Sequence, residues 1–307
     1  MEFKVSKPHW SDGWYYKIEI EPGQFTDGTR RKNLALTRNL LRNVQLKGHH
    51  CLDIGTAEAV IPVLLKRGGA ETVVAYDRID SSEKIRTIQD VYQVDFEYIH
   101  SMLLPDLQTA LLESPGRKFF DLVVFSGVLY HLFNPLGLLA LARGFCKIGG
   151  LFLLETCVCH DEKEKLVFNA AGLHGPNYFY ATTAWLDYCL RMMGLEPLHV
   201  VYNGPLAPED VCRMAILCRS RSAAVPLDET DDFMRKQMKF LFNQNLNEVM
   251  RYKLPDLLKT HSSIEYLPFT NDRIGATNGR RLFDVVNALP EYQPLEDETR
   301  LRLNASM

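Results

Sequence analysis

Acidic and glycine residues that follow two apolar segments could bind a nucleotide-like ligand. The apolar run containing Asp53 leads through Gly55 into a predicted helix, an arrangement by which α/β sheets bind such ligands. Asp77 ends the next apolar run, 22 residues after Gly55, and its carboxylate could accept hydrogen bonds from both hydroxyls of a ribose. Gly55 could also serve only a tight turn. Asp77 could instead cap a helix, but Asp80 with Glu83 is predicted to provide that cap.

The same turn disfavours a pyrophosphate and favours a sulfonium cofactor. A dinucleotide site carries glycines that let the pyrophosphate approach the helix N-terminus, whereas this turn has Ala57 and Val60 at two of those positions. Adenosine joined to a sulfonium amino acid has no pyrophosphate. Its ammonium group needs acceptors, which Asp53 and the backbone near Gly55 can provide. The alternative function is that of a nicotinamide-dependent oxidoreductase, which Val60 disfavours because it replaces a glycine of the dinucleotide motif.

Alternating apolar and amphipathic segments predict the α/β sheet that would position these residues. The predicted strands are 49–54, 72–76, 96–100, 120–125, 151–156, 198–202 and 211–218. The predicted helices are 58–67, 81–93, 135–147 and 182–193. Residues 203–210 are too few for a crossover helix, so we expect the last two strands to pair antiparallel at the sheet edge.

Two segments, 1–44 and 221–307, flank a predicted cofactor-binding domain of residues 45–220. The first is rich in aromatic side chains: Trp10, Trp14, Tyr15 and Tyr16. We expect it to close over the cofactor or to plug one edge of the core. The second is predicted to be a helical extension with an apolar stripe of Met234, Met238, Leu241 and Phe242. We expect this extension to cover the acceptor side of the core or to form a homodimer contact.

Composition and charge indicate which classes of partner and which compartment to expect. The 307 residues are 46% hydrophobic and 24% charged, the net charge is −3, and no apolar run is long enough to cross a membrane. Nucleic acid is therefore possible but not favoured as a partner, and a membrane is not expected. We expect a cytoplasmic protein with seven reduced cysteines. Cys157, Cys159 and His160 lack the spacing of a zinc site, so no metal is predicted.

Further segments resemble class I S-adenosylmethionine-dependent methyltransferases. The resemblance rests on residues 120–132, on Asn134-Pro135-Leu136 and on residues 153–156 after Gly149-Gly150. With Trp14 and Asn177-Tyr178-Phe179, these segments are most similar to the branch of the tRNA wobble-uridine carboxymethyltransferase and its small-molecule relatives. The similarity covers about residues 10–220 and implies a Rossmann-like seven-stranded methyltransferase sheet whose last strand is antiparallel.

The resemblance implies roles for individual residues. The cofactor, S-adenosylmethionine, would contact Trp14, Asp53, Gly55, Thr56, Ala57, Asp77, Arg78, Ser126 and Gly127. Methyl transfer is an in-line displacement, so alignment supplies much of the catalysis, and a base is needed only if the acceptor keeps its proton. The candidate catalytic residues are His131, Tyr130 and Glu155, although each could be structural. Asn177, Tyr178 and Tyr180 are candidates for lining the acceptor pocket.

Two departures from the branch bear on cofactor and acceptor. Ala57 replaces a common glycine. The tRNA-modifying relative has a longer N-terminal region with a lysine that helps to hold a carboxylated cofactor, and of that set only Tyr130 has a counterpart here. We therefore predict plain S-adenosylmethionine and methyl transfer to an O or N atom of a small molecule. The alternatives are tRNA (carboxy)methylation and a non-catalytic subunit that keeps the fold.

Overall fold

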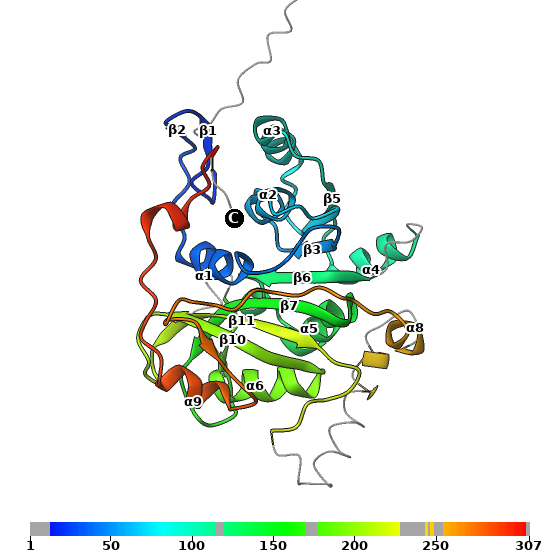
Figure 1. The fold of residues 1–307 in the computed structure, drawn as a ribbon, viewed down its shortest axis with the longest axis vertical. Helices are drawn as coiled ribbons and strands as arrows, with labels where there is room; N and C mark the ends of the chain where they lie inside the picture. The colour runs from blue at the N-terminus through cyan, green and yellow to red at the C-terminus, as the bar shows by residue number, and fades with distance from the viewer. Residues whose placement is uncertain are drawn as a thin grey trace, which may run out of the picture.

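A mixed ten-stranded sheet forms the centre of the molecule (Figure 1). The structure is a computed structural model that describes residues 13–113, 119–169, 177–227, 243–244, 246–248 and 254–304. The principal strands are β3 (His50–Ile54), β4 (Thr72–Asp77), β5 (Glu97–His100), β6 (Phe120–Ser126), β7 (Cys146–Cys159), β10 (Leu195–Asn203) and β11 (Val211–Ser220). All seven predicted strands are therefore confirmed, and most extend beyond the predicted bounds.

The strand order follows the expected Rossmann-like methyltransferase topology. Along the sheet the principal strands run β10-β11-β7-β6-β3-β4-β5, and those from β7 to β5 are parallel. β11 is antiparallel to both β7 and β10, because the short link after β10 can only reverse the chain. β11 thus lies between these two strands, and the antiparallel pair of β10 and β11 forms the edge of the principal strands, as expected. Three short strands were not predicted: β8 (Leu166–Phe168), β9 (Phe179–Thr182) and β12 (Gly275–Ala276).

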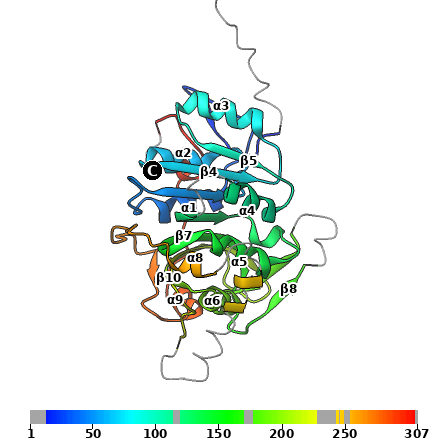
Figure 2. The same cartoon turned by 90° about the vertical axis from the view of Figure 1, so that its right-hand side faces the viewer.

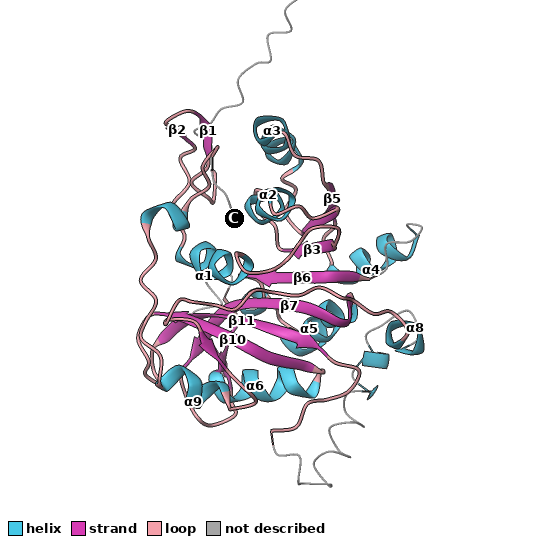
Figure 3. Cartoon of the chain, viewed as in Figure 1, coloured by secondary structure: helices cyan, strands magenta, loops and turns pink. Residues whose placement is uncertain are grey.

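Helices cover both faces of the sheet (Figures 2 and 3). On one face lie α1 (Lys32–Leu41), α2 (Val60–Arg67) and α3 (Ser82–Tyr92), whose apolar residues share one core cluster. On the other lie α4 (Leu104–Glu113), α5 (Pro135–Gly144) and α6 (Thr183–Met192), with the short helices α8 (Leu254–Leu258) and α9 (Leu282–Asn287). Two apolar layers therefore sandwich the sheet, as β strands buried on both faces require. Helices α1 and α4 were not predicted.

Helix ends differ from the sequence expectations at several places: α5, for example, ends at Gly144 rather than at Lys147, because β7 begins at Cys146. Helix α2 begins at Val60 rather than at Glu58, because Ala59 before it has a left-handed φ of 59°. The predicted cap of α3 by Asp80 and Glu83 is wrong: Ser81 occupies the N-cap position without a side-chain cap bond. Asp80 Oδ1 instead accepts hydrogen bonds from the Ser82 backbone N and Oγ at 3.0 and 2.6 Å.

The segments that flank the sheet pack on it and on each other. Residues 13–31 form the hairpin of β1 (Glu19–Glu21) and β2 (Gln24–Phe25), which bridges to Leu301 through Ile18. In Figure 1 the red end of the chain lies beside this blue hairpin. In residues 254–304 the extension consists of α8, β12, α9 and the 3-10 helix η3 (Glu296–Thr299), joined by irregular segments. The predicted stripe of Met234, Met238, Leu241 and Phe242 lies outside the described residues.

The described residues contain no helix that is both long and apolar enough to cross a membrane. All seven cysteines are free and buried. Both ring nitrogens of His160 have polar protein partners: they lie 3.1 Å from Thr183 Oγ1 and 2.9 Å from Asn287 Oδ1. Its ring stacks on Phe283 at 4.5 Å between centroids, so this histidine joins α6 to α9.

Candidate functional site

The carboxyl ends of β3, β4 and β6 bring the predicted cofactor residues to one edge of the sheet. Gly55 follows β3, Asp77 ends β4, and Ser126 with Gly127 ends β6. Gly55 has a φ of 86°, and a Cβ there would lie 2.2 Å from Val128 Cγ2. The fold itself therefore requires glycine at Gly55, in addition to any close approach of a ligand.

Asp77 holds the turn that follows β3. Its Oδ2 accepts a hydrogen bond from the Ala57 backbone N at 2.8 Å, and its Oδ1 accepts one from the Ile79 backbone N at 2.9 Å. The side chain is buried, at 7% exposure. A carboxylate has about four acceptor positions, so these two bonds leave capacity for further donors such as ribose hydroxyls. Arg78, the next residue, is exposed.

Asp53 is a buried carboxylate without a full set of partners. Its side chain is 1% exposed, and neither its Oδ2 nor the Thr56 Oγ1 makes a hydrogen bond in the described part of the chain. Burial raises the pKa of Asp53 to about 7, although the adjacent Thr56 side chain lowers it, and the Asp77 carboxylate adds a smaller upward contribution. A buried, incompletely bonded carboxylate is costly unless a donor or cation binds it, so this position suits an ammonium group.

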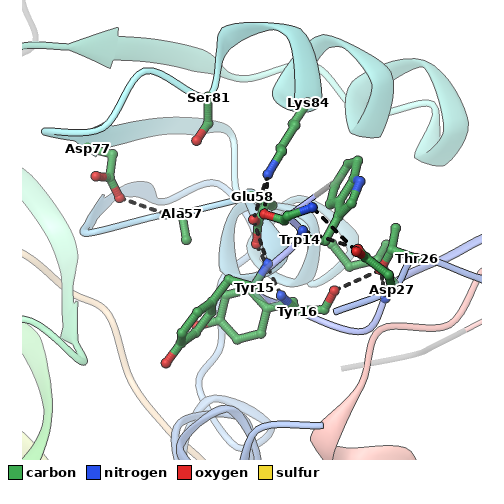
Figure 4. A network of polar contacts seen from close by, with 12 residues as sticks. Trp14, Tyr15, Tyr16, Thr26, Asp27, Ala57, Glu58, Asp77, Ser81 and Lys84 are labelled. Atoms are coloured by element: carbon green, nitrogen blue, oxygen red, sulfur yellow. Dashed lines mark hydrogen bonds and ion pairs between the residues drawn. The ribbon is translucent and has the colours of Figure 1, made fainter. Parts of the chain in front are cut away.

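Glu58 joins the turn to the N-terminal segment, a contact that sequence reasoning missed (Figure 4). This buried carboxylate accepts hydrogen bonds from the backbone N of Tyr15 at 2.8 Å and of Tyr16 at 3.2 Å. Lys84 Nζ of α3 lies 3.4 Å from Glu58 Oε1 and donates to the Gly13 carbonyl at 2.7 Å. The only sequence signal for this contact was an acidic residue in a turn that otherwise carries small residues.

Trp14 belongs to the same network of contacts as Glu58 and Lys84. Its backbone N and that of Gly13 donate to the two oxygens of Asp27, at 3.2 and 3.3 Å. Lys84 Nζ lies 5.1 Å from the centre of the Trp14 ring. In Figure 4 this ring lies beside Lys84, on the other side of Glu58 from Asp77. The structure thus brings Trp14 to the turn but does not bring its ring to Asp77.

Glu155 forms a buried ion pair with Arg213 of β11. Arg213 Nε and Nη2 donate to the two Glu155 oxygens at 2.7 and 3.0 Å, and Nη2 also donates to the Tyr130 hydroxyl at 3.1 Å. Burial lowers the pKa of Arg213, but the Glu155 carboxylate outweighs it and the net shift is upward. Ser126 Oγ lies 3.4 Å from Glu155 Oε2. In this geometry Glu155 holds the Arg213 guanidinium against the Tyr130 hydroxyl. Arg213 itself, a charged residue inside an apolar strand, was missed.

Tyr130 and His131 lie in η1 (Leu129–His131), the short 3-10 helix after β6. Burial raises the pKa of the Tyr130 hydroxyl, so this group stays protonated. The Tyr130 and His131 rings lie 4.1 Å apart, and His131 is partly exposed. The Tyr130 carbonyl accepts from the Tyr178 backbone N at 2.8 Å, which attaches the hairpin of β8 and β9 to η1.

The hairpin of β8 and β9 brings together the predicted acceptor residues. Asn177 Nδ2 lies 3.4 Å from the Tyr180 hydroxyl, and Asn169 Nδ2 donates to the Asn177 carbonyl at 3.0 Å. The Tyr178 ring lies 6.1 Å from the ring of Phe133, which follows η1 and is 78% exposed. The acceptor candidates therefore adjoin η1 and form a surface on which aromatic rings predominate.

A family of methyltransferase domains matches residues 28–196, more than half of the chain. The chain belongs to this methyltransferase family. Its membership, together with the sheet topology, confirms the predicted enzyme class, an S-adenosylmethionine-dependent methyltransferase.

Curated methyltransferases of the predicted branch are similar in sequence. The tRNA U34 carboxymethyltransferase of Pseudoalteromonas translucida is 26% identical over 215 residues, 58% of this chain and 63% of that one. The enzyme of the same name from Geobacter sp. strain M21 is 28% identical over 159 residues, 49% of this chain and 47% of that one. The matches thus span less than two thirds of these relatives.

A solved structure supports the fold. The N-terminal domain of EvdMO1 with S-adenosylhomocysteine bound is 16% identical, with a TM-score of 0.52. The similarity covers 68% of this chain and 92% of that domain. The methyltransferase sheet is thus shared with this structure.

Proposed function

We propose that this methyltransferase transfers a methyl group to an O or N atom of a small-molecule acceptor, with S-adenosylmethionine bound along the turn after β3. The observation that carries the acceptor class is the aromatic, amide-bordered surface next to His131. Phe133 and Phe168 are 78% and 50% exposed there, and the Phe168 ring lies 5.6 Å from that of Phe179. An exposed apolar surface on a chain of net charge −3 favours a small acceptor with apolar surface over a polyanion.

Four groups of this chain fit the cofactor. Asp53, which has an oxygen without a partner, would take the ammonium group, and the backbone at Gly55 would pass close to the methionine portion. Asp77 keeps acceptor capacity for the ribose. A Cβ at Gly127 would lie 3.7 Å from the Tyr130 hydroxyl, so the Gly127 backbone and the Tyr130 ring would border the same ligand. When bound, S-adenosylmethionine supplies an electrophilic methyl group.

His131 is the proposed proton acceptor, and alignment is the main catalytic effect. In-line displacement requires acceptor, methyl group and sulfur to be collinear, an effect worth up to about 7–11 kcal/mol in favourable systems. His131 is partly exposed at the boundary between the cofactor edge and the aromatic surface, where it could receive a proton from an acceptor hydroxyl or amine. Tyr130, held by Arg213, would orient the reacting groups.

The test is product analysis with defined cofactors and acceptor pools. The protein is incubated with S-adenosylmethionine and either a small-metabolite extract or bulk tRNA, and products that gain one methyl group are identified by mass spectrometry. We expect products in the metabolite pool, and none with the Gly55→Val variant, in which the turn is blocked. Products confined to tRNA would refute the small-molecule acceptor.

Modification of a tRNA uridine by a carboxylated cofactor is the second candidate. It is supported by the two curated relatives. It is also supported by the Arg213 guanidinium beside the Tyr130 hydroxyl, because this cation could bind the carboxylate of such a cofactor. The same incubation with carboxy-S-adenosylmethionine distinguishes it, because carboxymethylated uridine in the tRNA pool would favour this candidate over the first.

A further inference from the structure

Two alanines in the turn that follows β3 have a backbone conformation that favours glycine. Ala57 has a φ of 48°, and Ala59 has φ and ψ of 59° and 28°. The left-handed region is unfavourable for any residue with a Cβ, because the Cβ approaches the following carbonyl oxygen. Such residues persist only where surrounding contacts determine the backbone path. The contacts that hold these two alanines therefore control the shape of the turn.

Glu58, between the two alanines, makes the contacts that can fix this path. Its carboxylate accepts from the backbone N of Tyr15 and Tyr16, at 2.8 and 3.2 Å, and contacts Lys84 Nζ at 3.4 Å. Ala57 has a second restraint, the bond from its backbone N to Asp77. The hydrogen bonds given for Ala59 are backbone bonds within the turn and α2, and its methyl group is buried in the core beside α2. Glu58 is thus the adjacent residue whose side chain ties this part of the turn to another segment.

We propose that Glu58 is a positioning residue for cofactor binding. By fastening the turn to the backbone of Tyr15 and Tyr16, it holds Ala59 in the left-handed conformation that glycine would adopt without help. The N-terminal segment thereby substitutes for a glycine of the cofactor turn. This inference rests on the proposed cofactor site, since it concerns the shape of the same turn.

The experiment is a double-mutant cycle on S-adenosylhomocysteine binding, measured by calorimetry on the full chain. Glu58→Gln frees the turn, and a drop of its binding-competent fraction to about one tenth would weaken affinity about tenfold. Ala59→Gly in that background should restore affinity to within about threefold of the parent, because glycine adopts the left-handed conformation without a steric cost. Ala59→Gly alone should change affinity by less than about twofold, since the parent turn is already in place.

Asp27→Asn is the matched control. Asp27 also accepts from two consecutive backbone N–H groups of the segment, those of Gly13 and Trp14, but it does not contact the turn. This variant loosens the segment and leaves Glu58 in place, so it should bind S-adenosylhomocysteine within about threefold of the parent. Addition of Ala59→Gly to Asp27→Asn should give no recovery.

The results separate failure of the positioning role from failure of the cofactor site. Unchanged affinity in Glu58→Gln, or a loss that Ala59→Gly does not restore, would overturn the positioning role. Failure of the parent to bind S-adenosylhomocysteine, or normal binding by Gly55→Val, would instead refute the proposed cofactor site. If Glu58→Gln does not fold, Lys84→Met removes the third contact of the carboxylate. It should weaken binding about threefold, again with recovery by Ala59→Gly, and absence of that pattern would also overturn the role.

Discussion

The raised pKa of Asp53 makes both stability and cofactor affinity depend on pH. The folded protein holds this carboxyl with a pKa of about 7, against an ordinary value of 3.8, and burial is the main cause. That difference corresponds to about 4 kcal/mol at 1.36 kcal/mol for each pH unit. Below pH 4 the group is protonated in folded and unfolded chains alike. Between pH 4 and 7 only the folded chain keeps the proton, so the free energy of unfolding falls as pH rises.

The perturbation is Asp53→Asn, which removes the titrating group and nearly preserves the shape of the side chain. Between pH 5 and pH 7.5 the parent should lose up to about 3 kcal/mol of stability that the variant does not lose. Urea denaturation of both proteins at the two pH values measures the difference, and all other titrating groups cancel between the proteins.

Cofactor binding gives an independent measurement of the same group. The ammonium group of S-adenosylhomocysteine should lower the pKa of Asp53, so binding at pH 6 should release about 0.9 proton, the fraction protonated beforehand. Calorimetry in two buffers of different ionisation enthalpy counts these protons. If stability differences between parent and variant are equal at both pH values and binding releases no proton, the assignment of Asp53 to the ammonium group is wrong.

Three further predictions concern other parts of the site. Asp77→Asn should weaken S-adenosylhomocysteine binding by about 1.5–3 kcal/mol in calorimetry, whereas Asp80→Asn nearby should not; equal effects would contradict the ribose role. Arg213→Met leaves Glu155 buried without its partner and should lower the free energy of unfolding by about 3–5 kcal/mol. Adding Glu155→Gln should recover part of this loss, and no recovery in urea denaturation would argue against the pair. S-adenosylhomocysteine should slow tryptic cleavage within residues 13–31 if that segment closes over the cofactor, and cleavage at equal rates with and without it would favour a plug.

The strands and the cofactor turn could be predicted because their signals are local. Strand β6, for example, is an apolar run buried along nearly its whole length, and glycine at Gly55 marks the turn after β3. Helix α1 lacks such signals, since Arg31 at its N-cap position makes no side-chain cap bond and its first turn carries no acid. Short strands such as β12 exist only through pairing with a distant partner, so no local pattern marks them.

The contacts that organise the site join residues far apart in the chain. Glu58 meets Tyr15 across 43 residues, and Arg213 meets Glu155 across 58. Neither the composition nor the periodicity of one chain specifies such pairs. Asp53 and Asp77 were assigned from position alone, and their environments, a missing partner for one and two backbone donors for the other, emerge only from the packed structure.

The bridge between the N-terminal hairpin and Leu301 has a consequence for synthesis on the ribosome. Glu19 N donates to the Leu301 carbonyl and Leu301 N donates to the Lys17 carbonyl, at 2.9 and 3.0 Å, and Arg31 N donates to the Thr299 carbonyl. The hairpin emerges first, but these partners emerge among the last residues described. A nascent chain can thus assemble its parallel strands before the hairpin has these hydrogen-bond partners. The hairpin that contacts the turn after β3 therefore gains these hydrogen bonds only after residues 299–301 have been synthesised, so cofactor binding should follow their emergence.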